Sequence, residues 1–515
     1  MIEAENMSHH KKLSINALSN LFRYLTYVVV TFLLTPITIR CLGESAYGLW
    51  VVVLSVVGYA GILEMGVQTA VVKLVAQYHG ANDAKSLNQV VGAALAFFTG
   101  VGLLVATVFW AILPLFIDLM VADPSGRETV RQLLIILGIN VVFVFPTYVF
   151  SGMVYGFQVY HLKNLIDVVS VIVNAILVYL LLIKGYGIFA LATVKVFGDV
   201  VSLAALYLLS RKVFPQLRLS FLGIGKERYK EIFSLGGKIF SSATMVRIAA
   251  NGEPLIISYA LSNAATAVFS IPKRLIDYVK EISWSLTTGF MPMFSQLYGK
   301  SDTEGIRRIY LQYTRYLVML LAPILAAVAV YGTPFISLWI GDTFAAKGKT
   351  LVLLLSASFA VECLQPLVWR MFIGVNRVGL LVRVSSFSSL AYLLLAFTLV
   401  WKLGINGVAL GGLIVSCVCQ SIFLIHTARY LQMSTLNYLK ECHLMPILNT
   451  LVLLALMLWV SVTWPPVSYG VLVLQVTGTL VVYAAVSWLF ALTETERLRI
   501  LDFIRTRRTM LLQEK

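Results

Sequence analysis

The chain has 515 residues, of which 59% are hydrophobic and 12% are charged, and its mean hydropathy is +0.86. Soluble domains carry roughly a quarter of charged residues, so this composition excludes an ordinary soluble protein and predicts a chain built for lipid. The net charge of +16 does not call for a nucleic-acid partner, because most of the cations follow the pattern of membrane topology described below.

Apolar runs separated by short polar segments predict about 14 transmembrane helices, since a bilayer core needs about 20 apolar residues per helix. Open β-structure would leave backbone groups unpaired in lipid, so the expected fold class is an all-α polytopic membrane protein. In chain order the expected spans are residues 13–39, 46–73, 90–119, 132–156, 162–184, 186–210, 232–261, 265–296, 311–341, 348–371, 378–401, 404–430, 445–464 and 467–492.

The first apolar run, 13–39, follows a polar segment and is too long for the core of a signal peptide, so we expect an uncleaved first span. With the N-terminus inside, about 24 lysines and arginines between the spans lie on the cytoplasmic side and about 7 on the other, which is the positive-inside pattern. We therefore expect both termini in the cytoplasm, with the basic tail near anionic lipid head groups.

Short strings recur at an offset of about 220 residues, which indicates an internal repeat. Each repeat holds six spans, so both have the same orientation and predict two lobes with a central cavity that opens to each side by rocking. The expected domains are an N-terminal lobe (1–210), a cytoplasmic loop (211–231), a C-terminal lobe (232–432), two extra helices (433–492) and a basic cytoplasmic tail (493–515). The matched strings are 42–46 (LGESA) with 261–265 (LSNAA), 77–80 (QYHG) with 296–299 (QLYG), 114–117 (PLFI) with 334–337 (PFIS), Pro146 with Pro366, and 187–188 (GI) with 407–408 (GV).

About nine lysines and arginines fall inside the expected spans, and each would cost about 2.5–3.5 kcal/mol at the centre of a lipid-exposed helix. They are therefore expected to face water, acidic side chains or substrate. The excess of cations predicts an anionic substrate that bears phosphate or an acidic sugar, because guanidinium groups bind phosphate oxygens in pairs. The expected substrate-binding cations are Arg23, Arg247, Lys273, Arg274 and Lys280, and the acids expected to pair with them or to couple transport to an ion are Glu64, Glu253, Asp277 and Glu281.

Local spacing separates these charges into groups. Lys195 and Asp199 are four residues apart, which favours a structural ion pair on one helix face. Lys273, Asp277 and Lys280 share about a third of the circumference of the eighth span with Glu281 and Trp284. This charged stripe is either a ladder of ion pairs or the wall of a binding site.

Two further positions leave alternatives open. The string 252–254 (GEP) predicts an interruption of the seventh span near Glu253, which either lines a cavity or is a packing kink. Arg23 and Glu64 lie at mid-depth of the first two spans, where they either pair or form opposite walls of the cavity. Lys238 and Arg315 are expected to reach the membrane interface.

Several chemistries have no signature in the chain. No G-x-x-x-x-G-K-[ST] string occurs, so hydrolysis of ATP by the chain itself is not expected. The cysteines are scattered and typical of small packing residues. We expect a transporter rather than an enzyme, with no cofactor and no metal.

The string 42–50 (LGESAYGLW), with Asn16 before it and 63–66 (LEMG) after it, resembles the polysaccharide-type, Wzx-like flippases. These belong to the multidrug/oligosaccharidyl-lipid/polysaccharide (MOP, MATE-like) exporter superfamily. The step at 185–187 (GYG) is similar too. The resemblance extends over essentially the whole chain and implies two six-helix lobes plus two C-terminal helices, with the first, second, seventh and eighth spans lining the cavity.

The resemblance implies a flippase in the bacterial inner membrane that moves oligosaccharide repeat units linked to undecaprenyl diphosphate for O-antigen, capsule or exopolysaccharide assembly. The implied partners are that substrate, membrane lipids, H⁺ or Na⁺, and the polysaccharide polymerase and chain-length proteins, without nucleic acid. Three alternatives remain open at this point: a lipid II flippase, a MATE-type drug/cation antiporter, and a non-transporting scaffold of a synthase complex.

Overall fold

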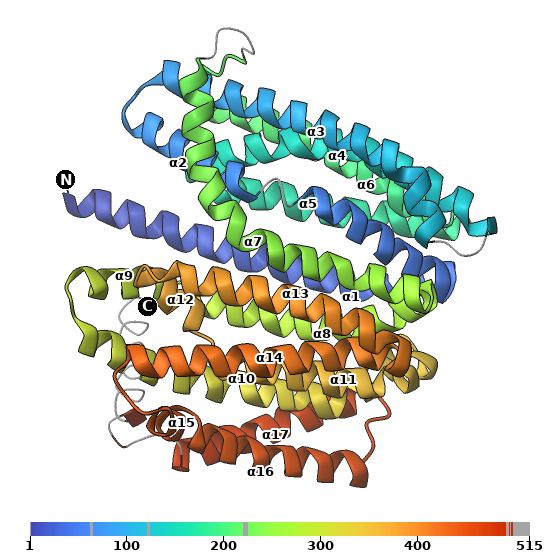
Figure 1. Cartoon of the computed structure of the whole chain (residues 1–515), viewed down its shortest axis with the longest axis vertical. Coiled ribbons are helices and arrows are strands. Elements are labelled where there is room, and N and C mark those ends of the chain that lie inside the picture. Colours follow the sequence, from blue (N-terminus) through green and yellow to red (C-terminus); the bar gives the residue numbers. More distant parts are fainter. Residues whose placement is uncertain are drawn as a thin grey trace, which may run out of the picture. The chain divides into compact units, whose positions relative to one another are not determined.

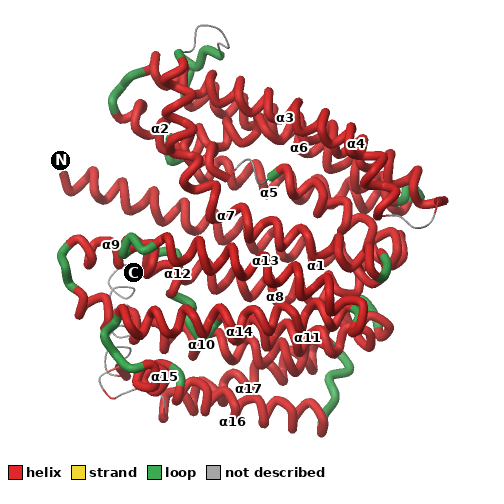
Figure 2. Tube along the Cα trace, in the orientation of Figure 1, coloured by secondary structure: helices red, strands yellow, loops and turns green. Residues whose placement is uncertain are grey.

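The computed structural model of the chain describes residues 2–61, 65–120, 124–219 and 225–490, together with 494, 496 and 497. All regular elements in these residues are helices, which confirms the expected all-α polytopic class (Figures 1 and 2). The helices are α1 (Ile2–Ala60), α2 (Met65–Gly80), α3 (Ala84–Met120), α4 (Pro124–Gly156), α5 (Tyr160–Ile183), α6 (Ile188–Val213), α7 (Lys226–Ala260), α8 (Asn263–Thr287), α9 (Phe290–Gly299), α10 (Thr303–Trp339), α11 (Asp342–Glu362), α12 (Val368–Gly374), α13 (Val378–Leu403), α14 (Ile405–Tyr430), α15 (Thr435–Cys442), α16 (Leu444–Thr463) and α17 (Tyr469–Phe490).

Contacts divide the chain into two compact units, Met1–Ala267 (unit 1) and Val268–Lys515 (unit 2). Unit 1 holds α1 to α7, and unit 2 holds most of α8 and all helices after it. Helix α7, which the sequence placed in the second lobe, packs against α1, α2 and α3. The lobe boundaries given above remain a prediction.

In the described part of the chain, 11 helices are long and apolar enough to cross a membrane. The first of these runs through most of α1, which is bent at Gly43 and so joins the first expected span to the start of the second. The expected spans that fall outside this set are α7 and α8, which carry the charged residues of interest, and the short α2.

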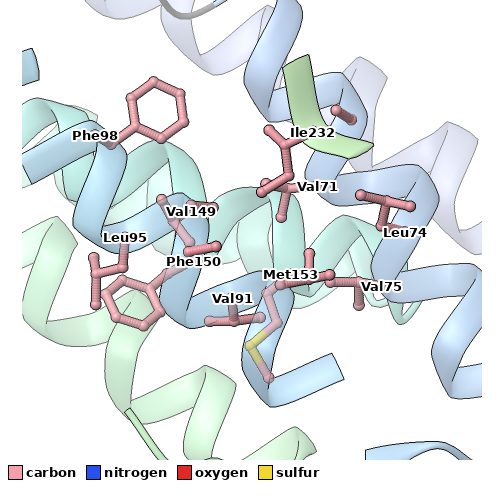
Figure 3. Packing of buried hydrophobic residues seen from close by; sticks show 14 of the residues in the cluster. Val71, Leu74, Val75, Val91, Leu95, Phe98, Val149, Phe150, Met153 and Ile232 are labelled. Atoms are coloured by element: carbon pink, nitrogen blue, oxygen red, sulfur yellow. The ribbon is translucent and has the colours of Figure 1, made fainter. Parts of the chain in front are cut away.

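The core of unit 1 lies where α2, α3, α4 and the start of α7 meet (Figure 3). Apolar residues recur at helical spacing on each of these helices, so that each presents one apolar stripe to the others. Gly152 and Gly156 on α4 lie opposite Val71 and Val75, and a Cβ at Gly156 would come within 2.7 Å of the Val75 side chain. These small residues therefore let α4 and α2 approach closely. The packed side chains include Val71, Leu74, Val75, Val91, Leu95, Phe98, Val149, Phe150, Met153 and Ile232.

The family-like string 42–50 has a structural explanation inside unit 1. Gly43 adopts φ 81° and ψ 168°, a conformation that is almost confined to glycine, and it bends α1. Gly48, one turn later, lies directly against the carbonyl of Asn263, so that a Cβ there would overlap the carbonyl oxygen. Thus one glycine sets the direction of the chain and the other permits a close backbone contact.

In unit 2, α10 packs against α11, and α14 packs against both α11 and α13. The two C-terminal helices α16 and α17 lie along α10 (Figure 1). The Tyr483 hydroxyl donates to the Met319 carbonyl at 3.0 Å, and the Tyr331 hydroxyl donates to the Met457 carbonyl at 3.4 Å. Helix α8 packs on α10 and α11 through Ile276 and Val279, which fixes the rotation of its charged stripe.

The repeat inferred from the strings is visible in the backbone of the two units. Helix α2 ends at Gly80 and α9 ends at Gly299, and each is followed by a residue with positive φ, Asn82 (53°) or Ser301 (57°). Asp83 then accepts a hydrogen bond from the Ser86 amide, as Asp302 does from the Gly305 amide. Hydrogen bonds from the Ser86 side chain and amide lower the pKa of Asp83, which lies between α2 and α3.

One match of the repeat was wrong by three residues. Gly187, at the start of α6, adopts φ 60° and ψ −148°, and its counterpart is Gly404, at the start of α14, with φ 59° and ψ −145°. Gly407, which the sequence comparison paired with Gly187, lies inside α14. The shared backbone conformation of Gly187 and Gly404, rather than the similarity of the apolar residues that follow, shows which positions of the two repeats correspond.

Two other expectations need correction. The interruption expected near Glu253 does not occur, because helix α7 continues from Lys226 to Ala260 with Pro254 inside it. A helix can continue through proline, which keeps a helical φ and removes one backbone hydrogen bond. The breaks occur elsewhere: the expected eighth span divides into α8 and α9, and the expected tenth span divides into α11 and α12, with Pro366 between them. Interrupted helices of this kind are typical of transporter binding sites.

Candidate functional site

In unit 1, Arg23 lies beside α5. Its Nε is 4.0 Å from the carboxylate of Asp167, which also accepts a hydrogen bond from Lys163 Nζ at 2.5 Å. Asn164 Nδ2 donates to the side chains of Ser19 and Asn20 at 2.9 Å, which holds α5 against α1 at this level. Two cations thus share one carboxylate. Glu64 lies outside the described residues, so both alternatives for it and Arg23, a pair or opposite walls of a cavity, stay predictions.

Arg247 and Glu253 both lie on α7, and their environments differ. The Arg247 side chain is exposed in unit 1, whereas Glu253 is buried and engaged in an interaction of its own. Asn251 packs against Gly58, where a Cβ would lie 2.7 Å from its Oδ1, and Tyr59 donates to the Ile248 carbonyl at 3.2 Å. Contacts with α1 therefore fix the orientation of this part of α7. The side chain of Lys238 lies outside the described ones.

The charged stripe on α8 lies in unit 2. Lys273 and Arg274 are half-buried, whereas Asp277, Lys280 and Glu281 are exposed. Lys273, Arg274 and Asp277 each have an interaction partner. Ile276 and Val279 pack against α10 and α11 in the core of unit 2, and the exposed residues of the stripe lie next to them on the helix surface.

Lys280 pairs with a residue that the sequence did not single out. Its Nζ lies 3.5 Å from Glu362, at the end of α11, and 5.2 Å from the centre of the Phe359 ring. Ser416 on α14 donates to the other carboxylate oxygen of Glu362 at 3.2 Å. The Lys280 side chain is nevertheless 44% exposed, so it has room to contact a ligand as well as Glu362.

Arg370 is the second residue that the sequence did not single out, because it was counted among the cytoplasmic loop cations. It lies on α12 and is only 7% exposed. Its guanidinium stacks on Trp284, 3.8 Å from the ring centre, and makes long hydrogen bonds to Thr287 Oγ1 (3.4 Å) and the Trp284 carbonyl (3.3 Å). Among the described residues no carboxylate lies within ion-pair distance of it.

This arrangement leaves a buried positive charge that is balanced by dipoles rather than by an acid. Trp284 and Thr287 belong to the last turn of α8, whose carbonyls carry partial negative charge. A helix end compensates a full charge only in part, which makes the α8–α12 junction a candidate site for an anion. We call Lys280, Trp284, Glu362 and Arg370 the junction cluster.

Two of the other cations within the expected spans are paired with acids, as the spacing of Lys195 and Asp199 predicted for the first of them. Lys195 Nζ lies 3.1 Å from Asp199 Oδ2, and Asn140 on α4 donates to the same oxygen at 2.8 Å. Arg315 forms an ion pair with Glu496, which also accepts a hydrogen bond from Tyr316 at 2.6 Å. Neither pair belongs to the junction cluster.

The Lys195–Asp199 pair gives a direct test of a structural role. Asp199→Asn is expected to lower the free energy of unfolding by about 1–3 kcal/mol, because it leaves a cation without its acid inside a span. The double variant Lys195→Met/Asp199→Asn is expected to recover most of that loss and to retain transport. Thermal unfolding in detergent and transport in cells measure the two quantities, and a double variant that folds but does not transport would contradict the structural assignment.

The described features define a helical multi-pass membrane protein with an internal repeat, interrupted helices and charges within its spans. A family model described as "Polysaccharide biosynthesis protein" matches residues 37–347. The chain belongs to this family, and its resemblance to the polysaccharide-type exporters is confirmed.

Two curated relatives are similar over most of their length. An uncharacterized membrane protein EpsK of Bacillus subtilis (strain 168) is 24% identical over 430 residues, 80% of this chain and 82% of that protein. A putative O-antigen transporter of Shigella flexneri is 19% identical over 402 residues, 77% of this chain and 93% of that protein.

Solved structures share the fold at low identity. Lipid II flippase MurJ in an inward closed conformation aligns with a TM-score of 0.73 at 14% identity, covering 92% of this chain and 98% of that one. A multidrug-resistance MATE family transporter of the MOP superfamily, in an inward-facing conformation, aligns with a TM-score of 0.70 at 16% identity, covering 81% of this chain and 99% of that one. The fold is therefore that of MOP-superfamily transporters.

Proposed function

We propose that the chain is a flippase that moves an oligosaccharide repeat unit linked to undecaprenyl diphosphate across the bacterial inner membrane, for O-antigen, capsule or exopolysaccharide assembly. Transport proceeds by alternating access, with both termini in the cytoplasm. The family supports a role in polysaccharide biosynthesis, and the relative from Shigella flexneri, named a putative O-antigen transporter, supports transport.

The junction cluster is the observation that most directly supports an anionic substrate. Arg370 is buried with neutral partners, and Lys280, one turn before Trp284 on α8, is exposed with Glu362 as its one counter-ion among the described residues. Both favour a diphosphate over a cationic drug. Lys273 and Arg274 on α8 extend the cationic surface, and Arg23 and Arg247 supply cations in unit 1.

A lipid II flippase is the second candidate, because that substrate also carries a diphosphate on a polyprenyl chain and the MurJ fold covers most of this chain. A MATE-type antiporter is the third, and the positive charge at α8 and α12 weighs against it. The acids Glu64, Glu253, Asp277 and Glu281 are the proposed sites of coupling to H⁺ or Na⁺. The polymerase and chain-length proteins are the proposed protein partners.

A depletion strain separates these functions. If the chain is an oligosaccharide flippase, its loss causes lipid-linked repeat units to accumulate on the inner leaflet only, while cell-wall synthesis continues. Inner-leaflet accumulation of lipid II with normal repeat-unit export would instead support the second candidate. Normal levels of both lipids would contradict the proposal.

A further inference from the structure

Trp284 presents an aromatic surface on the charged stripe of α8. The residue is 58% exposed although the Arg370 guanidinium covers one face of its ring. Its position one turn after Lys280 places it on the polar side of the helix, whereas a lipid-facing aromatic belt is expected on an apolar side. The uncovered part of the indole thus lies next to the ionic groups of the junction cluster.

Arg370 fixes the orientation of this ring. It comes from α12, which follows the break at Pro366, and α12 packs against α9. The guanidinium is held at the end of α8 by the Trp284 carbonyl and the Thr287 hydroxyl. Stacking of a cation on an indole is strongest when the cation is desolvated, as Arg370 is here, so the ring is held in one orientation before a ligand arrives.

The free face of an oriented indole is suited to a sugar ring. The face of an aromatic ring is negatively polarised, and the C–H groups along one side of a pyranose are weakly positive and apolar. Lys280, on the same side of α8, is placed to bind phosphate or an acidic group attached to that sugar. A Trp beside a Lys therefore matches the point where a sugar joins a diphosphate.

We propose that Trp284 is a stacking platform for a sugar ring near the diphosphate of the substrate, and that Arg370 is the positioning residue that holds the platform. This inference rests on the proposed function and makes unit 2 a site of carbohydrate recognition. In this proposal Trp284 binds the sugar, and Lys273, Arg274 and Lys280 bind the negatively charged diphosphate.

The test compares two lipids on the purified full chain in nanodiscs: undecaprenyl diphosphate alone and the same lipid carrying the repeat-unit oligosaccharide. Trp284→Leu is expected to weaken binding of the glycosylated lipid about tenfold and to leave binding of the bare lipid unchanged. Trp284→Phe is expected to stay within about threefold of wild type, because it keeps an aromatic face. Trp459→Leu, at an equally exposed tryptophan on α16, is the matched control and is expected to change neither affinity.

Arg370 is tested by the ratio of the two affinities. Arg370→Gln is expected to lower the preference for the glycosylated lipid, and Arg370→Lys to restore part of it. A size-exclusion profile and thermal midpoint close to those of wild type show that each variant is folded. Equal preference for the glycosylated lipid in Trp284→Leu and wild type would overturn the stacking platform, whereas failure of wild type to bind either lipid would overturn the proposed function itself.

Discussion

Gly48→Ala is expected to remove most of the folded protein from the membrane. The new Cβ would overlap the Asn263 carbonyl oxygen and would lie 3.1 Å from the Ala267 amide nitrogen. Both contacts are with backbone atoms, so no side-chain rotation relieves them, and α1 must separate from the turn between α7 and α8. We expect a loss of about 3 kcal/mol or more, at the upper end for overpacked cores.

The folded fraction is measured by size-exclusion chromatography of a fluorescent fusion and by its thermal midpoint. Gly100→Ala is the matched control, because it lies in the membrane helix α3 and no atom comes within 4 Å of a Cβ placed there. It is expected to be neutral or slightly stabilising. Equal folded yields for Gly48→Ala and Gly100→Ala would show that the close contact at Gly48 does not exist.

Loss of the two cations Arg274 and Lys280 is expected to reduce export of lipid-linked repeat units by about a hundredfold. Each substitution removes a charged contact to the diphosphate worth about 1.5–3 kcal/mol. Together the two losses correspond to a decrease in affinity of about two or more powers of ten. Complementation of the depletion strain with Arg274→Gln/Lys280→Gln measures this effect. Arg383→Gln, on α13 with its Nε bonded to the Gly379 carbonyl, is the control and is expected to export normally.

Lys280→Gln also leaves the Glu362 carboxylate without its counter-ion. A double variant separates this effect from the loss of a contact to the ligand. In Lys280→Gln/Glu362→Gln both charges are absent, so a purely structural ion pair predicts recovery of transport. A ligand role for Lys280 predicts that transport stays low while the folded yield recovers. Recovery of both would assign Lys280 to structure and would leave Arg274 to bind the diphosphate.

The features that sequence predicted best are those set by local spacing. Lys195 and Asp199 are four apart on one helix, and the structure pairs them. The strings ending at Gly80 and Gly299 coincide with the ends of α2 and α9. In each case the signal lies within one or two helical turns, where chain geometry leaves few alternatives.

Contacts between distant segments were missed for the opposite reason. Glu362 is far from Lys280 along the chain, and only the packing of α8 on α11 brings them together. Arg370 was counted as a loop cation because the break after α11 was not foreseen. Pro366, inside the expected span 348–371, was the available signal, since proline often ends a helix near the preceding residue. The same rule misled at Pro254, where α7 continues.

We propose that the chain itself moves a diphosphate-linked oligosaccharide across a bilayer. The most direct test of this proposal is a proteoliposome assay with the purified wild-type chain, in which the fraction of labelled lipid-linked repeat units accessible from outside is followed over time with ion gradients present and collapsed. We predict protein-dependent flipping that is lost in Arg274→Gln/Lys280→Gln and is not competed by a cationic drug. Flipping no faster than in protein-free liposomes, with a folded protein in the membrane, would contradict the proposal.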